Sequence, residues 1–130
     1  LFMPRTSTER GLWVAVAIPA GVSEEVTYRG VMFAVLAGIT GSALAGAVVA
    51  SLIFGISHIV QGWRTPAIIT FIARLLHGLV ALSGTIMLAI VIHTVYDIIA
   101  GLAYGRMGEE LGYPVDGIPP ATNDAPVVAA

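Results

Sequence analysis

A long stretch of the chain carries almost no charge: between Gly30 and Gly105 only Arg64, Arg74 and Asp97 are charged. Charged residues make up 11% of the whole sequence and hydrophobic residues 57%, whereas soluble domains average about 25% charged residues. The stretch is long enough for roughly three apolar spans of about 20 residues each. The apolar excess is therefore expected to face lipid, and the predicted fold class is an all-α, multi-pass transmembrane helical bundle.

The predicted bundle has four core helices within residues 11–105. Pro19 is expected to kink the first helix, because proline lacks the N–H that its turn needs. Residues 1–10 are predicted to be a cytoplasmic lead-in and residues 106–130 a flexible cytoplasmic tail. The four expected helices occupy residues 11–37, 43–60, 66–82 and 85–104.

The loop arginines predict the orientation in the membrane. Arg5 and Arg10 precede the first helix, Arg64 lies between the second and third helices, and Arg106 follows the fourth. All of these positions fall on one side of the predicted bundle, and arginine is enriched in loops on the cytoplasmic side. We therefore expect a cell-membrane protein, in contact with lipid, whose two ends are both cytoplasmic.

Composition excludes several classes of function. The net charge is −2, every cation is arginine and no basic cluster occurs, so no nucleic-acid partner is expected. The sequence has no cysteine, which excludes disulfides, thiolate zinc sites and a cysteine nucleophile. No organic cofactor is expected.

Five charged groups nevertheless fall inside the predicted helices. Each costs roughly 2.5 to 3.5 kcal/mol at mid-bilayer depth unless it is paired, so these groups are expected to converge. Glu25 and Arg29 are four residues apart, in the order that the helix dipole favours, whereas Glu24 projects about 100° away. One glutamate would thus be neutralised and the other left available. The five are Glu24, Glu25, Arg29, Arg74 and Asp97, joined by the imidazoles of His58, His77 and His93.

Two further helices each place a polar pair on one face. Phe54 and His58 are four residues apart in the second predicted helix, and His93 and Asp97 are four residues apart in the fourth. Together with Glu24, these pairs would let three helices present a carboxylate and two imidazoles to one interior cavity.

The order of these groups resembles the CPBP family, which comprises CAAX proteases and bacteriocin-processing intramembrane proteases. Each motif alone is weak, but three of them in a fixed order at membrane depth form a specific pattern. The resemblance implies an all-helical peptidase with its active site inside the bilayer. Members usually carry further helices before the first motif, so we expect an N-terminal part to be missing from this sequence. The three motifs are Glu24-Glu25-x-x-x-Arg29, Phe54-x-x-x-His58 and His93-x-x-x-Asp97.

The resemblance and the chemistry of peptide hydrolysis together suggest a role for each motif residue. Glu24 is the expected general base, and His58 would share or orient the attacking water. Glu25 and Arg29 would hold the glutamate helix in register, and Phe54 would pack against neighbours or line the cavity. The predicted substrate is a membrane-associated peptide or protein, or a C-terminal CAAX-like segment.

The fourth helix departs from the family pattern at one position. The resemblance implies that members with Asn at the position of Asp97 stabilise the oxyanion there with His93, but an ionised carboxylate cannot donate a hydrogen bond. Asp97 is therefore expected to be protonated, to orient His93, or to ligate a metal. The nitrogen and oxygen atoms of four side chains would also suit Zn²⁺ with one position open to water: Glu24, His58, His93 and Asp97. A metal-bound hydroxide and a metal-free glutamate base both stay open.

Other classes fit the sequence less well. A serine nucleophile at Ser57 is disfavoured because adjacent helical residues diverge by about 100°, so that Ser57 would not face His58. Aspartyl proteases need a pair of aspartates, and Asp97 is the only aspartate in a predicted helix. The alternative from a different class is a non-catalytic membrane scaffold or bacteriocin-immunity protein, in which the same polar residues only pack the helices.

Overall fold

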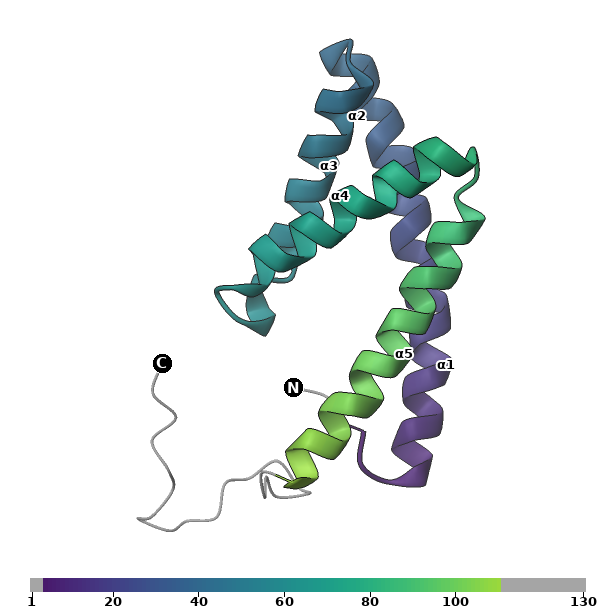
Figure 1. Ribbon diagram of the computed structural model, residues 1–130, viewed down its shortest axis with the longest axis vertical. Helices are drawn as coiled ribbons and strands as arrows, with labels where there is room; N and C mark the ends of the chain where they lie inside the picture. The colour runs from purple at the N-terminus through teal and green to yellow at the C-terminus, as the bar shows by residue number, and fades with distance from the viewer. Residues whose placement is uncertain (1–3, 111–130) are drawn as a thin grey trace.

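The structure, a computed structural model, describes residues 4–110 (Figure 1). All regular elements in that range are helices and none is a strand, so the all-α prediction is confirmed for this part of the chain. In chain order the elements are α1 (Ser7–Glu25), the π-helix η1 (Val26–Met32), α2 (Phe33–Thr40), α3 (Ala43–Ser57), the 3-10 helix η2 (Ile59–Gln61), α4 (Thr65–Ser83) and α5 (Met87–Glu110).

The helices α1, η1 and α2 follow one another directly and form one long helical segment. The segment starts earlier than the predicted residue 11, because Thr6 and Glu9 form a capping box: the Glu9 N–H donates to the Thr6 hydroxyl, and the Thr6 N–H donates to the Glu9 carboxylate. Hydrogen bonds from the backbone of Thr6 and Arg5 lower the pKa of Glu9. The segment ends at Gly41, whose φ of 65° lies in the left-handed region.

The irregularity predicted at Pro19 is found further along the chain. Pro19 lies inside α1, which continues to Glu25, and the departure from α-helical geometry comes after it, in η1. Short π-helical stretches within α-helices occur frequently at functional sites. In this protein the π-helix directly follows the two adjacent glutamates.

The later helices lie where the sequence predicts them but end at different residues. α3 stops at Ser57 instead of residue 60, and α4 ends before Gly84, whose φ is 68°. The predicted helix end at Gly105 is wrong, because α5 continues to Glu110 and takes in the first residues of the predicted tail. The rest of that tail, residues 111–130, lies outside the described residues.

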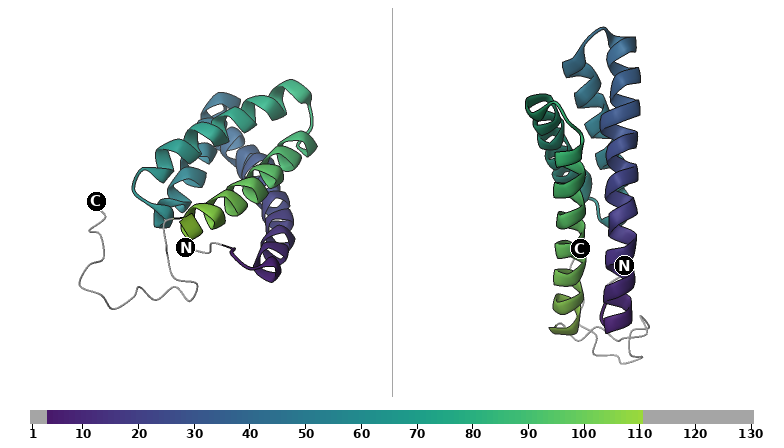
Figure 2. Two further views of the ribbon diagram at one scale, coloured as in Figure 1. Left: turned by 60° about the horizontal axis from the view of Figure 1, so that its bottom comes forward. Right: turned by 90° about the vertical axis from the view of Figure 1, so that its right-hand side faces the viewer.

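Helix pairs in close contact build the fold. α1 packs along α5, α2 packs on α3, and α3 packs on α4 (Figures 1 and 2). Small residues allow this approach. A Cβ on Gly21 of α1 would meet Thr94 of α5, and a Cβ on Gly55 of α3 would meet Thr70 and the Pro66 carbonyl of α4. Polar groups on four helices are thereby brought close together.

The fold buries polar groups and exposes apolar ones, the reverse of a soluble domain. Glu25, Arg29, Ser51, His77 and His93 are buried, while long apolar side chains are exposed on every α-helix. This distribution is expected where lipid surrounds the protein, since helix contacts in lipid depend on small residues and polar groups. The buried apolar residues are accordingly mostly alanine: Ala17, Ala47, Ala50, Phe54, Ala73, Leu76 and Ala89.

Two of the described helices are long and apolar enough to cross a membrane. They are Thr65–Ser83 in α4 and Met87–Gly108 in α5. At 1.5 Å per residue each is about 30 Å long, which matches the hydrocarbon core of a bilayer. α3 is also apolar but shorter, with 15 residues.

Candidate active site

The two adjacent glutamates at the end of α1 lie in different environments. Glu25 is completely buried, and its Oε1 lies 3.0 Å from Nη1 of Arg29, whose side chain is buried as well. This is the ion pair that the sequence spacing predicts. The side chain of Glu24, in contrast, is 35% exposed. One carboxylate is therefore held in the interior while its neighbour can reach water.

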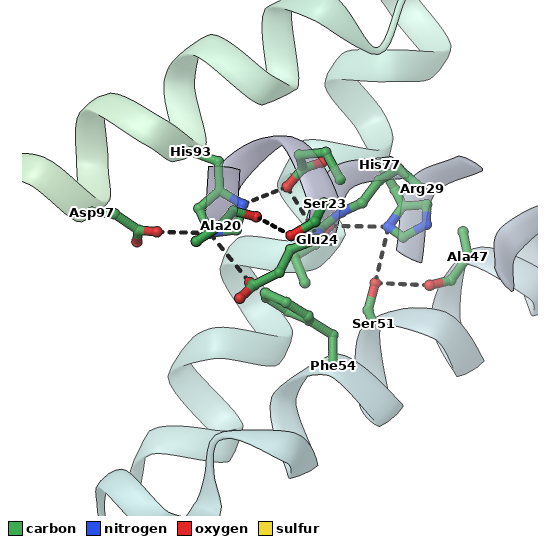
Figure 3. A network of polar contacts seen from close by, with 12 residues as sticks. Ala20, Ser23, Glu24, Arg29, Ala47, Ser51, Phe54, His77, His93 and Asp97 are labelled. Carbon is green, nitrogen blue, oxygen red and sulfur yellow. Dashed lines mark hydrogen bonds and ion pairs between the residues drawn. The ribbon is translucent and has the colours of Figure 1, made fainter. Parts of the chain in front are cut away.

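The imidazole of His93 on α5 lies close to both glutamates and to Asp97 (Figure 3). Its Nδ1 lies 2.7 Å from Glu25 Oε1, and because an ionised carboxylate only accepts hydrogen bonds, Nδ1 is the nitrogen that carries the proton. Its Nε2 lies 3.7 Å from Glu24 Oε2 and 3.5 Å from Asp97 Oδ2. Glu24, Glu25, His93 and Asp97 thus form one cluster across α1 and α5.

Contacts between α1 and α5 fix the position of His93. A Cβ on Gly21 would lie 3.1 Å from the backbone nitrogen of Thr94, the residue after His93. One helical turn further along α5, the Asp97 carbonyl accepts a hydrogen bond of 2.9 Å from Trp13 Nε1 of α1. The backbone on both sides of the His93 and Asp97 side chains is therefore held against α1.

His58 is placed by the end of α3 and not by its interior. It follows the last helical residue and has φ −94° and ψ 8°, a sparsely populated region where many active-site residues lie. Its Nδ1 is 2.8 Å from the Phe54 carbonyl and 3.1 Å from Ser57 Oγ. The expectation that Ser57 points away from His58 is wrong, because the helix ends between them. The Ser57 hydroxyl itself donates to the Phe54 carbonyl.

The ring of Phe54 lies between the two imidazoles. Its centroid is 4.6 Å from that of His58 and 5.9 Å from that of His93, and both contacts are edge-to-face. The guanidinium carbon of Arg29 lies 4.6 Å from the same centroid. The structure therefore places His58 beside the cluster, separated from His93 by an aromatic ring that packs as predicted.

A second polar group, which the sequence motifs do not include, lies on the other side of Phe54 (Figure 3). His77 of α4 is buried, and its Nδ1 lies 3.2 Å from Ser51 Oγ and 3.1 Å from the Ala73 carbonyl. Arg74 is on the same helix. The signal in the sequence was an arginine and a histidine three residues apart in an otherwise apolar helix, but their partners on α3 come from a distant part of the chain.

The described residues do not bring a metal-ligand set together. Among residues 4–110, no group of three or more His, Asp or Glu side chains is arranged to hold a metal ion. Nδ1 of His93 faces Glu25 and Nδ1 of His58 faces the Phe54 carbonyl, so only Nε2 of each ring could bind a metal. Because the four side chains do not converge on one metal position among the described residues, they do not fit Zn²⁺ as they are arranged, and the zinc site stays a prediction.

Comparison with known proteins identifies the family. The family model for Type II CAAX prenyl endopeptidase Rce1-like proteins matches residues 6–99, a range that contains all three motifs. No match was found among the curated proteins or the solved structures. The family match covers well over half of the chain and confirms the resemblance to CAAX proteases. The chain belongs to the Type II CAAX prenyl endopeptidase Rce1-like family, a family of integral membrane proteases.

Proposed function

We propose that this protein is an intramembrane endopeptidase in which Glu24 activates a water molecule for attack on a peptide bond. The contrast between the adjacent glutamates carries the proposal. Glu25 is buried and engaged by both Arg29 and His93, whereas Glu24 is partly exposed and lies beside His93 Nε2. Carboxylates in contrasting environments are a recurrent way in which hydrolytic sites divide their roles.

In the proposed reaction Glu24 accepts a proton from water while the resulting hydroxide adds to the peptide carbonyl carbon. The carbonyl oxygen then carries the negative charge. Glu24 returns the proton to the amide nitrogen as the C–N bond breaks, so that the products are a carboxylic acid and an amine. The 3.7 Å between Glu24 Oε2 and His93 Nε2 exceeds a direct hydrogen bond, which leaves both atoms available to the water and the substrate.

The two histidines are proposed to act through their Nε2 atoms. In His58, donation from Nδ1 to the Phe54 carbonyl leaves Nε2 as an acceptor that can orient the attacking water. In His93, Nδ1 donates to Glu25, so stabilisation of the oxyanion by Nε2 requires the imidazolium form. Asp97 lies next to that nitrogen and occupies the position where some members of the family carry an asparagine.

The proposed topology is multi-pass, with both ends of this chain in the cytoplasm. The exposed apolar side chains on all the α-helices support it, and so do the loop arginines, which fall on one side. The proposed substrate is a membrane-associated peptide or protein with a C-terminal CAAX-like segment, for which the family match is the support. The apolar surface would admit such a substrate from the lipid.

The test is a cleavage assay with the full chain in lipid nanodiscs. A panel of peptides with CAAX-like C-termini, with and without a prenyl group, is incubated with the wild type and with Glu24→Gln, and fragments are identified by mass spectrometry. We expect discrete cleavage of at least one peptide by the wild type and about 10²-fold to 10⁴-fold slower cleavage by Glu24→Gln. Cleavage of no peptide by folded protein would contradict the proposal and favour a membrane scaffold.

A chelation arm of the same assay tests the metal-free mechanism. After exhaustive dialysis against EDTA and 1,10-phenanthroline we expect unchanged cleavage, because Glu24 acts on water without a metal in the proposed reaction. Activity that is lost on dialysis and restored by Zn²⁺ would replace the glutamate base by a metal-bound hydroxide.

A further inference from the structure

A cavity of about 210 Å³ lies between η1, α2, α3 and α4, outside the cluster of Glu24, His93 and Asp97. Its wall is apolar where Phe33, Ala47 and Val80 contribute, and polar where Arg29, Arg74 and His77 do. The volume is below that of typical sites for drug-sized ligands, which begin at about 300 Å³. A cavity of this volume can hold the C-terminal end of a peptide or a small anion.

Several buried polar atoms in the wall, guanidinium donors among them, have no hydrogen-bond partner among the described residues. Arg29 Nε and Nη2 and His77 Nε2 are buried and form no hydrogen bond with any described residue. The Arg29 side chain is completely buried, and His77 is 7% exposed. Buried polar atoms are nearly always satisfied in folded proteins. Unsatisfied guanidinium donors that line a cavity therefore indicate a ligand that accepts hydrogen bonds.

The charges around the cavity call for an anion. Glu25 compensates Arg29, but within residues 4–110 no carboxylate forms an ion pair with Arg74. Arg74 is also the tenth of the 19 residues of α4, counted from Thr65, which corresponds to mid-membrane depth in the proposed topology, where α4 crosses the membrane. An uncompensated arginine at that depth is costly, and one negative charge in the cavity would balance it.

We propose, building on the peptidase function proposed above, that this cavity binds the free C-terminal carboxylate of the peptide substrate. Phospholipid phosphates lie near the bilayer surface and Arg74 lies near its middle, so depth favours a peptide end over a lipid headgroup. A carboxylate matches the planar donors of arginine in a two-point contact. The apolar part of the wall would receive the last side chain.

Arg29 lines the cavity and also contacts Glu25 of the proposed active site. Its guanidinium lies 3.0 Å from Glu25, and Glu25 is 2.7 Å from His93. Arg29 therefore belongs both to the cavity wall and to the series of contacts that ends at His93. Arg29 and Arg74 would act as binding residues that select a free C-terminus.

Binding of a matched pair of peptides tests this proposal without requiring cleavage. A fluorescent apolar hexapeptide with a free carboxylate, and the same peptide with a C-terminal carboxamide, are titrated by anisotropy against Glu24→Gln in phosphatidylcholine nanodiscs. We expect the carboxylate to bind about tenfold tighter or more, since hydrogen bonds to charged groups contribute this much. Adding Arg74→Gln should remove the preference, whereas Arg64→Gln, which removes an exposed arginine outside the cavity, should keep it.

Equal binding of the two peptides would overturn the proposal, and so would a preference that survives Arg74→Gln. If Arg74→Gln does not accumulate, Val80→Phe serves instead: it fills the cavity without removing a charge and should reduce the preference.

A preference that phosphatidylglycerol abolishes would assign the cavity to a lipid headgroup and overturn the peptide assignment. If the peptides show the preference but the wild-type protein cleaves neither of them, the anion site is retained and the peptidase function is rejected, whereas equal cleavage of both peptides by the wild type would do the reverse.

Discussion

His93 Nδ1 on α5 lies 2.7 Å from Glu25 Oε1 at the end of α1, so that a single buried carboxylate joins two helices and also faces Arg29. The neighbouring Glu24 makes no contact this close with His93. This arrangement assigns a structural role to Glu25 and leaves Glu24 for chemistry. The roles of the two glutamates can therefore be distinguished by making the same substitution, Glu to Gln, at each of the two positions.

Glu25→Gln should destabilise the fold far more than Glu24→Gln. Removing the Glu25 charge leaves Arg29 buried without its counter-ion, and breaking a buried pair in this way costs about 3 to 5 kcal/mol. We expect a melting temperature in nanodiscs lowered by roughly 10 °C or more, measured by tryptophan fluorescence. Equal melting temperatures for the two variants would show that the ion pair does not hold α1.

The close contact of α1 with α5 makes a further prediction about packing. In Gly21→Ala the new Cβ meets Thr94, including its backbone nitrogen at 3.1 Å, and overpacking of this kind costs about 1 to 3 kcal/mol. Because Thr94 adjoins His93, peptide cleavage should fall together with stability.

Gly11→Ala is the matched control on the same helix. Nothing lies within 4 Å of the position that its Cβ would take, so the substitution should stabilise α1 by about 0.5 to 1 kcal/mol through its higher helix propensity. Thermal unfolding and kcat of both variants, measured in one lipid, check the pair. A stabilising effect of both substitutions would contradict the close contact of the two helices.

Asp97→Asn should retain or raise kcat. An ionised Asp97 beside His93 Nε2 repels the negative charge that develops on the carbonyl oxygen, whereas an asparagine of the same shape can donate a hydrogen bond to it. Asp97→Ala keeps neither property and should not show the gain. A fall of about a hundredfold in Asp97→Asn would instead mean that the carboxylate charge is required, either to orient His93 or to ligate a metal.

The start of α1 should respond to acid through Glu9. Its pKa in the folded protein is lowered from 4.5 by hydrogen bonds from the backbone N–H groups of Thr6 and Arg5. A lowered folded pKa means that the stabilisation is present above 4.5 and is lost as the pH falls through the folded value. Hydrogen exchange of the first turn of α1 should therefore accelerate over this range in the wild type. Glu9→Gln should remove that pH dependence, and an unchanged profile would contradict the capping role.

Local pairs could be predicted from the sequence because helix geometry alone defines them. Glu25 with Arg29 and His93 with Asp97 are each four residues apart and share a helix face. The contact between Glu25 and His93 spans 68 residues, and its choice of Glu25 over Glu24 depends on how α1 and α5 pack. The spacing of the motif residues likewise does not predict the π-helix after Glu25 or the end of α3 before His58.

The cavity beside Arg29 shows the same limit. Arg74 and His77 stand out in the sequence as polar residues in an apolar helix, but their partners could not be predicted from it. In the structure Ser51 and Ala73 meet the His77 ring and Arg29 lines the same cavity. Their grouping depends on the packing of α3 against α4, which brings Ser51 to His77 across 26 residues of sequence.

The most direct test of the central claim is the joint measurement of kcat and melting temperature for Glu24→Gln in nanodiscs, with Ser23→Ala as the control. Ser23 is the exposed neighbour of Glu24 and donates only to the Ala20 carbonyl, so its loss should leave both quantities close to wild type. For Glu24→Gln we predict a melting temperature near that of the wild type and a kcat about 10² to 10⁴ times lower. A folded Glu24→Gln protein that cleaves peptide at the wild-type rate would contradict the account.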